Sequence, residues 1–276
     1  MTATLRPIAL TAFALALAWS ALPAAAQVVV RSPLSDDRTV PPGEVYEGTI
    51  VVANTTDEVQ QAKVYQTDYS FHADGSNRYD APGSSPRSNA GWIEFGPRAV
   101  TLAPGETIQV QYRVTVPAEA DGQAPAGTYW SMLMVEGIPR NSAESTLGDD
   151  TTPQYGVRQV TRYGVQIATH LLGSERPTIG FQQVRLQTSE SGGRVLEVDL
   201  ENQGDLFTRS TLWVELYAQD GTAQGRRDGT STRIYPGTSV RQQIDLSDLT
   251  PGQYEALIVV DSGEENVVGA QYTLEL

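Results

Sequence analysis

Hydrophobic and polar residues alternate at every second position through much of this chain. In the stretch 108–116, Ile-Gln-Val-Gln-Tyr-Arg-Val-Thr-Val, the apolar side chains fall on alternate residues, which places them on one face of an extended strand. The same alternation recurs at 46–52, 196–200, 212–216 and 254–258. After residue 26, no stretch keeps the three-and-four spacing of an amphipathic helix. The pattern predicts an all-β protein of half-buried antiparallel strands.

Turn signals separate the predicted strands at short intervals. The dipeptide Pro-Gly occurs at 42–43, 104–105, 236–237 and 251–252. Proline presets the backbone at the second position of a turn, and glycine accepts the positive φ that a type II turn requires next. Short strands spaced in this way are typical of β-sandwiches.

A weak internal repeat divides the chain into two halves. In the first half a strand ends at Asn54, Leu-Ala-Pro-Gly follows at 102–105, and Gly-Thr-Tyr opens a late strand at 127–129. The second half repeats this order with Asn202, Pro-Gly at 236–237 and Gly-Gln-Tyr at 252–254. Duplication and shared turn chemistry explain the repeat equally well. Either one predicts two immunoglobulin-like β-sandwich domains in tandem, at 27–172 and 173–276, with a polar link near 173–177.

The first 26 residues differ from the rest of the chain. Arg6 precedes an apolar run at 8–19, Pro23 follows, and Ala24-Ala25-Ala26 places small residues at a cleavage site. The alternative to a cleaved signal is a retained membrane anchor, but the apolar run is short for one. We expect a signal peptide at 1–26 with cleavage before Gln27. The mature chain has no second apolar run long enough to span a membrane, so we expect an exported protein in the periplasm or at the cell surface.

Composition argues against most catalytic chemistries. The chain has no cysteine and two histidines, His72 and His170, and it lacks the motifs of hydrolases, zinc proteases and nucleotide-binding enzymes. We therefore expect no enzyme activity, no cofactor and no metal site. We interpret His170, which lies in a predicted strand, as a residue of the domain interface. The net charge of −14 repels phosphate backbones, which excludes nucleic acid as a partner.

Two segments lack alternation and are rich in turn-forming residues. They span 72–91 and 139–154. Long loops in a compact domain are functional or disordered, and the composition of both segments favours disorder. Aromatic residues raise the separate question of sugar binding, because Trp92, Trp130 and Trp213 could stack on sugar rings if they formed an exposed row. Apolar neighbours place Trp130 in the core instead, whereas Trp213 alternates outward.

Two stretches of the first half carry a resemblance to a known family. Arg38-Thr39-Val40, leading to Ile-Val-Val-Ala-Asn at 50–54, and Gly-Thr-Tyr through Ile-Pro at 127–139 are similar to periplasmic pilus-assembly chaperones. The resemblance covers about residues 28–172. The turn at 102–106 and the strand at 163–167 also resemble extracellular immunoglobulin-like proteins that accompany WxL surface proteins, which contact peptidoglycan or partner proteins.

The chaperone resemblance implies a way of binding. Such chaperones add an edge strand to a subunit by β-augmentation and hold its terminal carboxylate with a basic pair. By this resemblance Arg38 supplies one anchor and Arg158 or Arg162 the other, while Val165 and Ile167 belong to the edge strand that receives the partner.

Two hypotheses follow from these observations. In the first, the chain is an exported, non-enzymatic protein-binding module that resembles a pilus-type chaperone, and its partner is a pilin-like or other surface protein. In the alternative, it is a structural or adhesive protein of the cell envelope that binds peptidoglycan, sugar or another surface protein.

Overall fold

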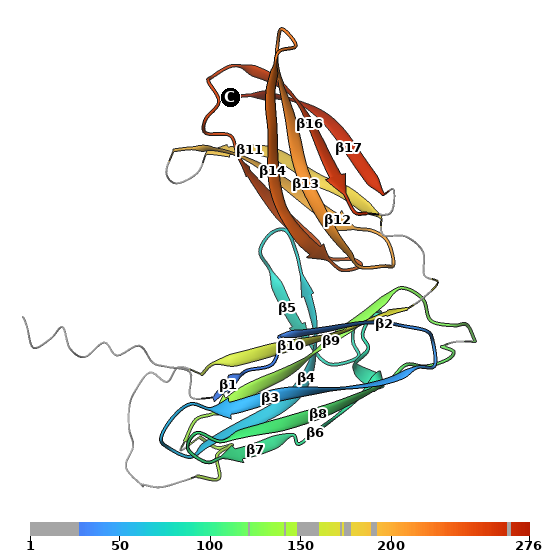
Figure 1. Ribbon diagram of the computed structural model, residues 1–276, viewed down its shortest axis with the longest axis vertical. Coiled ribbons are helices and arrows are strands. Elements are labelled where there is room, and N and C mark those ends of the chain that lie inside the picture. Colours follow the sequence, from blue (N-terminus) through green and yellow to red (C-terminus); the bar gives the residue numbers. More distant parts are fainter. Residues whose placement is uncertain are drawn as a thin grey trace, which may run out of the picture.

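The computed structural model describes residues 28–120, 122–140, 142–147, 160–171, 173, 178–188, 192–263 and 266–276. These residues fold into β-strands arranged as two β-sandwiches (Figure 1), which confirms the predicted all-β class. The predicted signal peptide lies outside the described residues, so its cleavage stays a prediction. Among the described residues, no helix has the length and apolar character needed to cross a membrane.

The first sandwich is formed by residues 28–171. One sheet has the strand order β1-β3-β8-β6, and the other has the order β2-β10-β9-β4-β5, with β7 paired to β4. The strands are β1 (Val28–Val30), β2 (Ser35–Val40), β3 (Val45–Asn54), β4 (Gln60–Phe71), β5 (Asn77–Asp80), β6 (Ile93–Gly96), β7 (Ala99–Leu102), β8 (Thr107–Thr115), β9 (Thr128–Ile138) and β10 (Arg162–Leu171).

Alternation explains how the first core forms. In β8, Val110, Tyr112 and Val114 are buried, whereas the residues between them are exposed. These side chains meet Ile50 of β3 and, from the facing sheet, Leu133 of β9 in one hydrophobic core. Burying a side chain of this size contributes about 2 kcal/mol, so the period-two pattern directs the stacking of the two sheets.

The second sandwich is formed by residues 179–275. Its sheets have the orders β11-β12-β15 and β14-β13-β16-β17. The strands are β11 (Ile179–Thr188), β12 (Arg194–Asn202), β13 (Thr208–Ala218), β14 (Ala223–Ile234), β15 (Ser239–Asp245), β16 (Gln253–Asp261) and β17 (Val267–Glu275). A separate core includes Leu200, Leu212 and Ile258. Residues 174–177 of the predicted link lie outside the described residues, so the domain limits stay a prediction.

The two asparagines of the internal repeat hold equivalent corners. Asn54 Nδ2 donates to the carbonyls of Glu58 and Leu102 at 2.7 and 3.2 Å, and its Oδ1 accepts from the N–H of Thr56 at 2.9 Å. Asn202 makes the corresponding three bonds at 2.8, 3.0 and 3.0 Å; its partners are Leu206, Ile234 and Gly204. In each half the asparagine therefore ties the end of its strand to the strand before the Pro-Gly turn.

The segment 72–91 is ordered, which contradicts the predicted disorder. It contains β5, paired with β4, and it leads to the short 3₁₀ helix η2 (Ala90–Trp92). The buried carboxylate of Asp68 accepts bonds from the backbone N–H of Gly83 and of Ser85 at 3.2 and 2.8 Å. Asn89 is fully buried. Polar anchoring in place of alternation therefore organises this segment. Of the second segment, residue 141 and residues 148–154 lie outside the described residues.

Candidate partner-binding edge and the contact between the sandwiches

Strand β10 lies at the edge of its sheet over half its length only. It pairs antiparallel with β9 from Arg162 to His170, but its parallel pairing with β2 begins at Gln166. Pro33 lies between β1, in the opposite sheet, and β2, and it has no N–H to donate. Before this residue the described chain does not run beside β10. Within the described residues, no strand lies beside 162–165 on the β2 side. The chaperone resemblance implied an exposed edge along this strand, and the structure leaves four residues of it without a described neighbour on that side.

No described strand pairs with the backbone groups on the open side of residues 162–165. The N–H of Gln166 donates to the Leu34 carbonyl at 2.9 Å, so by strand alternation the backbone groups of Gly164 and Arg162 point the same way. Exposed apolar side chains lie at both ends of this stretch: Leu34 is 49% exposed and Val160 is 42% exposed. Unpaired backbone groups beside exposed apolar residues are a template for a further strand.

Arg162 is engaged on the outer face of the sheet. Its Nε lies 2.8 Å from Glu136 Oε2, and the same carboxylate group lies 3.6 Å from Lys63 Nζ and accepts a 2.7 Å bond from the Tyr65 hydroxyl. The cation is therefore balanced by a carboxylate, although about half of the Arg162 side chain remains exposed.

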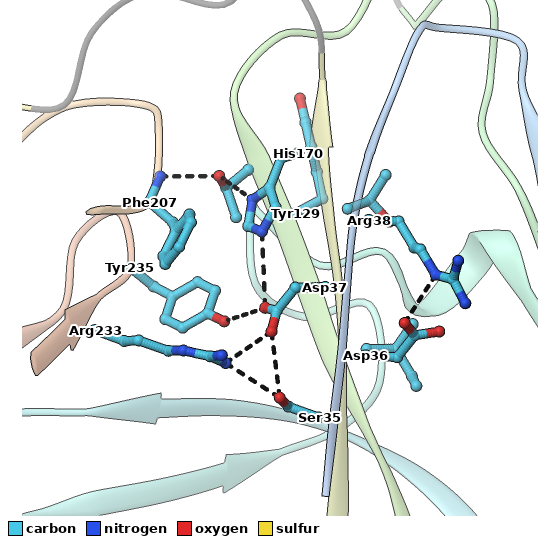
Figure 2. A network of polar contacts seen from close by, with 12 residues as sticks. Ser35, Asp36, Asp37, Arg38, Tyr129, His170, Phe207, Arg233 and Tyr235 are labelled. Carbon is cyan, nitrogen blue, oxygen red and sulfur yellow. Dashed lines mark hydrogen bonds and ion pairs between the residues drawn. The ribbon is translucent and has the colours of Figure 1, made fainter. Parts of the chain in front are cut away.

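Arg38 lies far from Arg162. It sits in β2 opposite Thr169, seven residues beyond Arg162 along β10, or about 23 Å at 3.3 Å per residue. Its guanidinium pairs with Asp36 at 2.8 Å, on the opposite side of β2 from Asp37 (Figure 2). One carboxylate cannot contact both arginines in this arrangement.

The other predicted site residues are differently placed. Val165 and Ile167 are buried in the first core, and by alternation their backbone groups face β9. Neither residue is therefore presented to a partner in this structure. Arg158 lies outside the described residues.

An aromatic cluster joins the two sandwiches. Tyr235, which follows β14, is 1% exposed and packs against Trp130 of β9 at a ring distance of 4.9 Å. Phe207 and Phe71 lie 5.5 and 6.3 Å from the same tyrosine ring. Trp130 is buried as predicted, but its neighbours include residues of the second sandwich. The cluster also includes Ala168 of β10, so the second sandwich covers the C-terminal half of that strand.

Asp37 of β2 is the polar centre of this contact (Figure 2). Its carboxylate lies 2.8 Å from Arg233 Nη1 and accepts a 3.1 Å bond from the Tyr235 hydroxyl. The Nε2 atom of His170 lies 3.7 Å away. The His170 imidazole makes the largest contribution to the carboxyl's pKa and, with Arg233 and Tyr235, outweighs burial. The pKa of Asp37 therefore falls from 3.8 to about 2.

His170 lies at the interface, which confirms its prediction. Its ring stacks on Phe207 at 4.4 Å, and its Nδ1 lies 2.9 Å from Thr128 Oγ1. Asp37, His170 and Thr128 follow the order of an acid, a base and a nucleophile. However, the Thr128 side chain is fully buried and its oxygen accepts the Phe207 N–H at 2.9 Å. No substrate can reach this hydroxyl in the closed interface, so the three residues are structural here.

Three loops of the first sandwich complete the contact. Gly127 has φ +89°, and a Cβ there would lie 2.3 Å from the Asp205 carbonyl oxygen. Only glycine fits so close to the second sandwich at this backbone angle. Arg87 pairs with the Asp205 carboxylate. At the tip of the β4–β5 hairpin, the Ala73 N–H donates to Ser239 Oγ at 3.0 Å.

Sequence reasoning missed Asp37, Arg233 and Tyr235. The available signal was the repeat itself: Tyr235 occupies the position before Pro-Gly that Ala103 holds in the first half. A large aromatic residue at one copy of a turn, and a small one at the other, points to a contact made by one half only.

The described residues form neither a metal site nor a row of tryptophans. No group of three or more His, Cys, Asp or Glu side chains in this part of the chain is placed to hold a metal ion. Trp130 is buried, Trp92 packs on Tyr129 at 4.6 Å, and Trp213 lies in the second sandwich beneath Arg226.

No protein-family model and no curated protein sequence matches this chain. Among solved structures, it is similar to a chain of the chaperone–tip adhesin complex of CFA/I fimbriae, with 14% identity over 89% of this chain and 98% of that one, and a TM-score of 0.46. The class 5 fimbriae chaperone CfaA has 14% identity over 90% and 100%, with a TM-score of 0.45. The Pseudomonas aeruginosa CupB2 chaperone has 12% identity over 90% and 100%, with a TM-score of 0.40.

Proposed function

We propose that this chain is an exported, non-enzymatic protein that binds a strand of a protein subunit beside residues 162–165 of β10, as a pilus-type chaperone does. The half-open edge of β10 carries this proposal. A partner strand there would accept hydrogen bonds from Arg162 and Gly164 and donate to their carbonyls, in line with β2. Its apolar side chains would cover Leu34 and Val160.

Strand addition requires backbone donors, so proline is the sharpest probe. The N–H of Arg162 points to the open side, so Arg162→Pro removes a donor that β9 does not use. Arg162→Ala is the matched control, because it removes the same side chain and the same ion pair with Glu136 but keeps the N–H.

The experiment uses the partner that co-purifies with the mature protein from its host, and calorimetry of that partner with each variant. We expect Arg162→Pro to weaken binding about tenfold or more and Arg162→Ala to weaken it much less. An equal loss in both variants would instead assign the binding to the arginine side chain. Unchanged affinity in the proline variant would exclude pairing at this edge.

A further inference from the structure

Among the described residues, strand β2 covers the second half of β10 and pairs with no other strand. It is the outermost strand of its sheet, so its backbone pairs on one side only, with residues 166–171. On the inner side of the sheet, the Tyr112 hydroxyl donates to Asp36 at 2.5 Å. A six-residue edge strand with one neighbour separates from its sheet more easily than a central strand does.

The second sandwich supplies the contacts on the outer side. Arg233 Nη1 donates to Ser35 Oγ at 3.1 Å and pairs with Asp37 at 2.8 Å. The Tyr235 hydroxyl reaches the same carboxylate at 3.1 Å. Figure 2 shows both side chains reaching β2 from the second sandwich. They contact Ser35 and Asp37, alternate residues of one short strand, so they hold its first half.

We propose that the second sandwich clamps β2 onto β10 and thereby sets how much of the β10 edge a partner can use. This inference rests on the proposed function of that edge. With the clamp closed, residues 162–165 are open. With β2 released, the whole of β10, from Arg162 to Leu171, becomes an edge.

The clamp couples the length of the bound strand to the contact between the sandwiches. A partner strand that stays beside 162–165 leaves the contact intact. A longer strand must displace β2 and separate Asp37 from Arg233 and Tyr235. Releasing β2 costs less free energy in a variant with a weakened clamp, so that variant should bind long strands more tightly. By linkage, a bound long strand should loosen the clamp by the same factor.

Amide hydrogen exchange of the full mature chain tests the clamp without any partner. The N–H groups of residues 166, 168 and 170 face β2, whereas those of 167 and 169 face β9. We expect Arg233→Met to speed exchange about tenfold or more at the first set and to leave the second set unchanged. Alternate residues of one strand thus serve as an internal control.

Arg241→Met is the matched control variant. Arg241 is also an arginine of the second sandwich that pairs with an aspartate, Asp199, at 2.7 Å, but its partner lies in the same sandwich. We expect this variant to leave exchange in β10 unchanged. Tyr235→Phe, which removes only the hydroxyl bond to Asp37, keeps the test available if Arg233→Met does not fold, and it should give a smaller rise at the same three amides.

The result that would overturn the clamp is unchanged protection at 166, 168 and 170, or an equal rise at 167 and 169, which would indicate general loosening. Either result would leave partner binding at 162–165 untouched. Conversely, failure of the proline variant to affect binding would leave the exchange result standing. The two ideas therefore fail separately.

Discussion

The corners built around Asn54 and Asn202 share their bonds and differ in one neighbour. In both, the asparagine N–H donates to a carbonyl just after a Pro-Gly turn, that of Glu106 or Thr238, at 2.9 and 3.1 Å. The residue before each turn is Ala103 in the first sandwich, which is exposed, and Tyr235 in the second, which is buried against the first sandwich. The same turn is thus a surface feature in one half and the anchor of an interface in the other.

The comparison shows which residue forms the corner in both halves and which residue serves the interface in one half only. The asparagine satisfies carbonyl groups that no strand partner reaches, and this requirement is the same in both halves. The aromatic side chain serves the contact between the halves. Substitutions at these positions should therefore fall into two classes, which the following predictions distinguish.

Tyr235→Ala should have the largest effect. The tyrosine is almost fully buried and contacts Trp130, Phe207 and Phe71, so its truncation should lower the free energy of unfolding by about 4 kcal/mol. Urea titration measures this change. A substitution at the equivalent position of the first sandwich, Ala103→Ser, should change the free energy of unfolding by no more than about 0.5 kcal/mol. A loss below about 1 kcal/mol for Tyr235→Ala would contradict its role as the anchor.

Asn54→Ala and Asn202→Ala should have smaller effects that match each other. Each removes three or more hydrogen bonds from a buried side chain and leaves carbonyls unpaired, which should cost about 3 kcal/mol. Hydrogen exchange resolved by residue should show the loss in the first sandwich for Asn54→Ala and in the second for Asn202→Ala. Effects that differ more than twofold would show that the two corners are not equivalent.

Acid should remove the smallest of the three contributions, that of Asp37. Its pKa is about 2 in the folded protein and 3.8 as the reference, so folding favours the ionised carboxylate. The resulting stabilisation, about 2 kcal/mol, is complete above pH 4 and is lost as the pH falls through 2. Unfolding curves at pH 6, 4, 3 and 2 measure it. Asp37→Asn should be less stable at pH 6 and should lack this component of the acid dependence. A parallel acid profile for both proteins would exclude the contribution.

Sequence alone predicted the features that depend on near neighbours. Alternation places side chains on two faces of a strand, and β8 follows it residue by residue. Asn54, Asn202 and the Pro-Gly turns were visible because turn chemistry is local. His170 was assigned to the domain interface from its place in a predicted strand, and the structure confirms this position.

Other features depend on residues that are far apart in the chain. Arg233 and Ser35 are 198 positions apart, and their meeting depends on how two finished sandwiches pack. The order of segment 72–91 depends on one carboxylate, Asp68, in the preceding strand. The half-covered edge of β10 depends on where the chain crosses between sheets at Pro33. No periodicity in the sequence records these three relationships.

The parallel pairing of β2 with β10 has a consequence for the order of folding. Gln166 pairs with Ser35, which precedes it by 131 residues, so a chain that emerges from its N-terminus exposes residues 35–40 long before their partner strand exists. Closing so long a loop is slow and entropically costly. The contacts from Arg233 and Tyr235 can form only later still. One of the first strands of the sandwich to be made is therefore among the last to reach its place, and until then the nascent chain carries it unpaired.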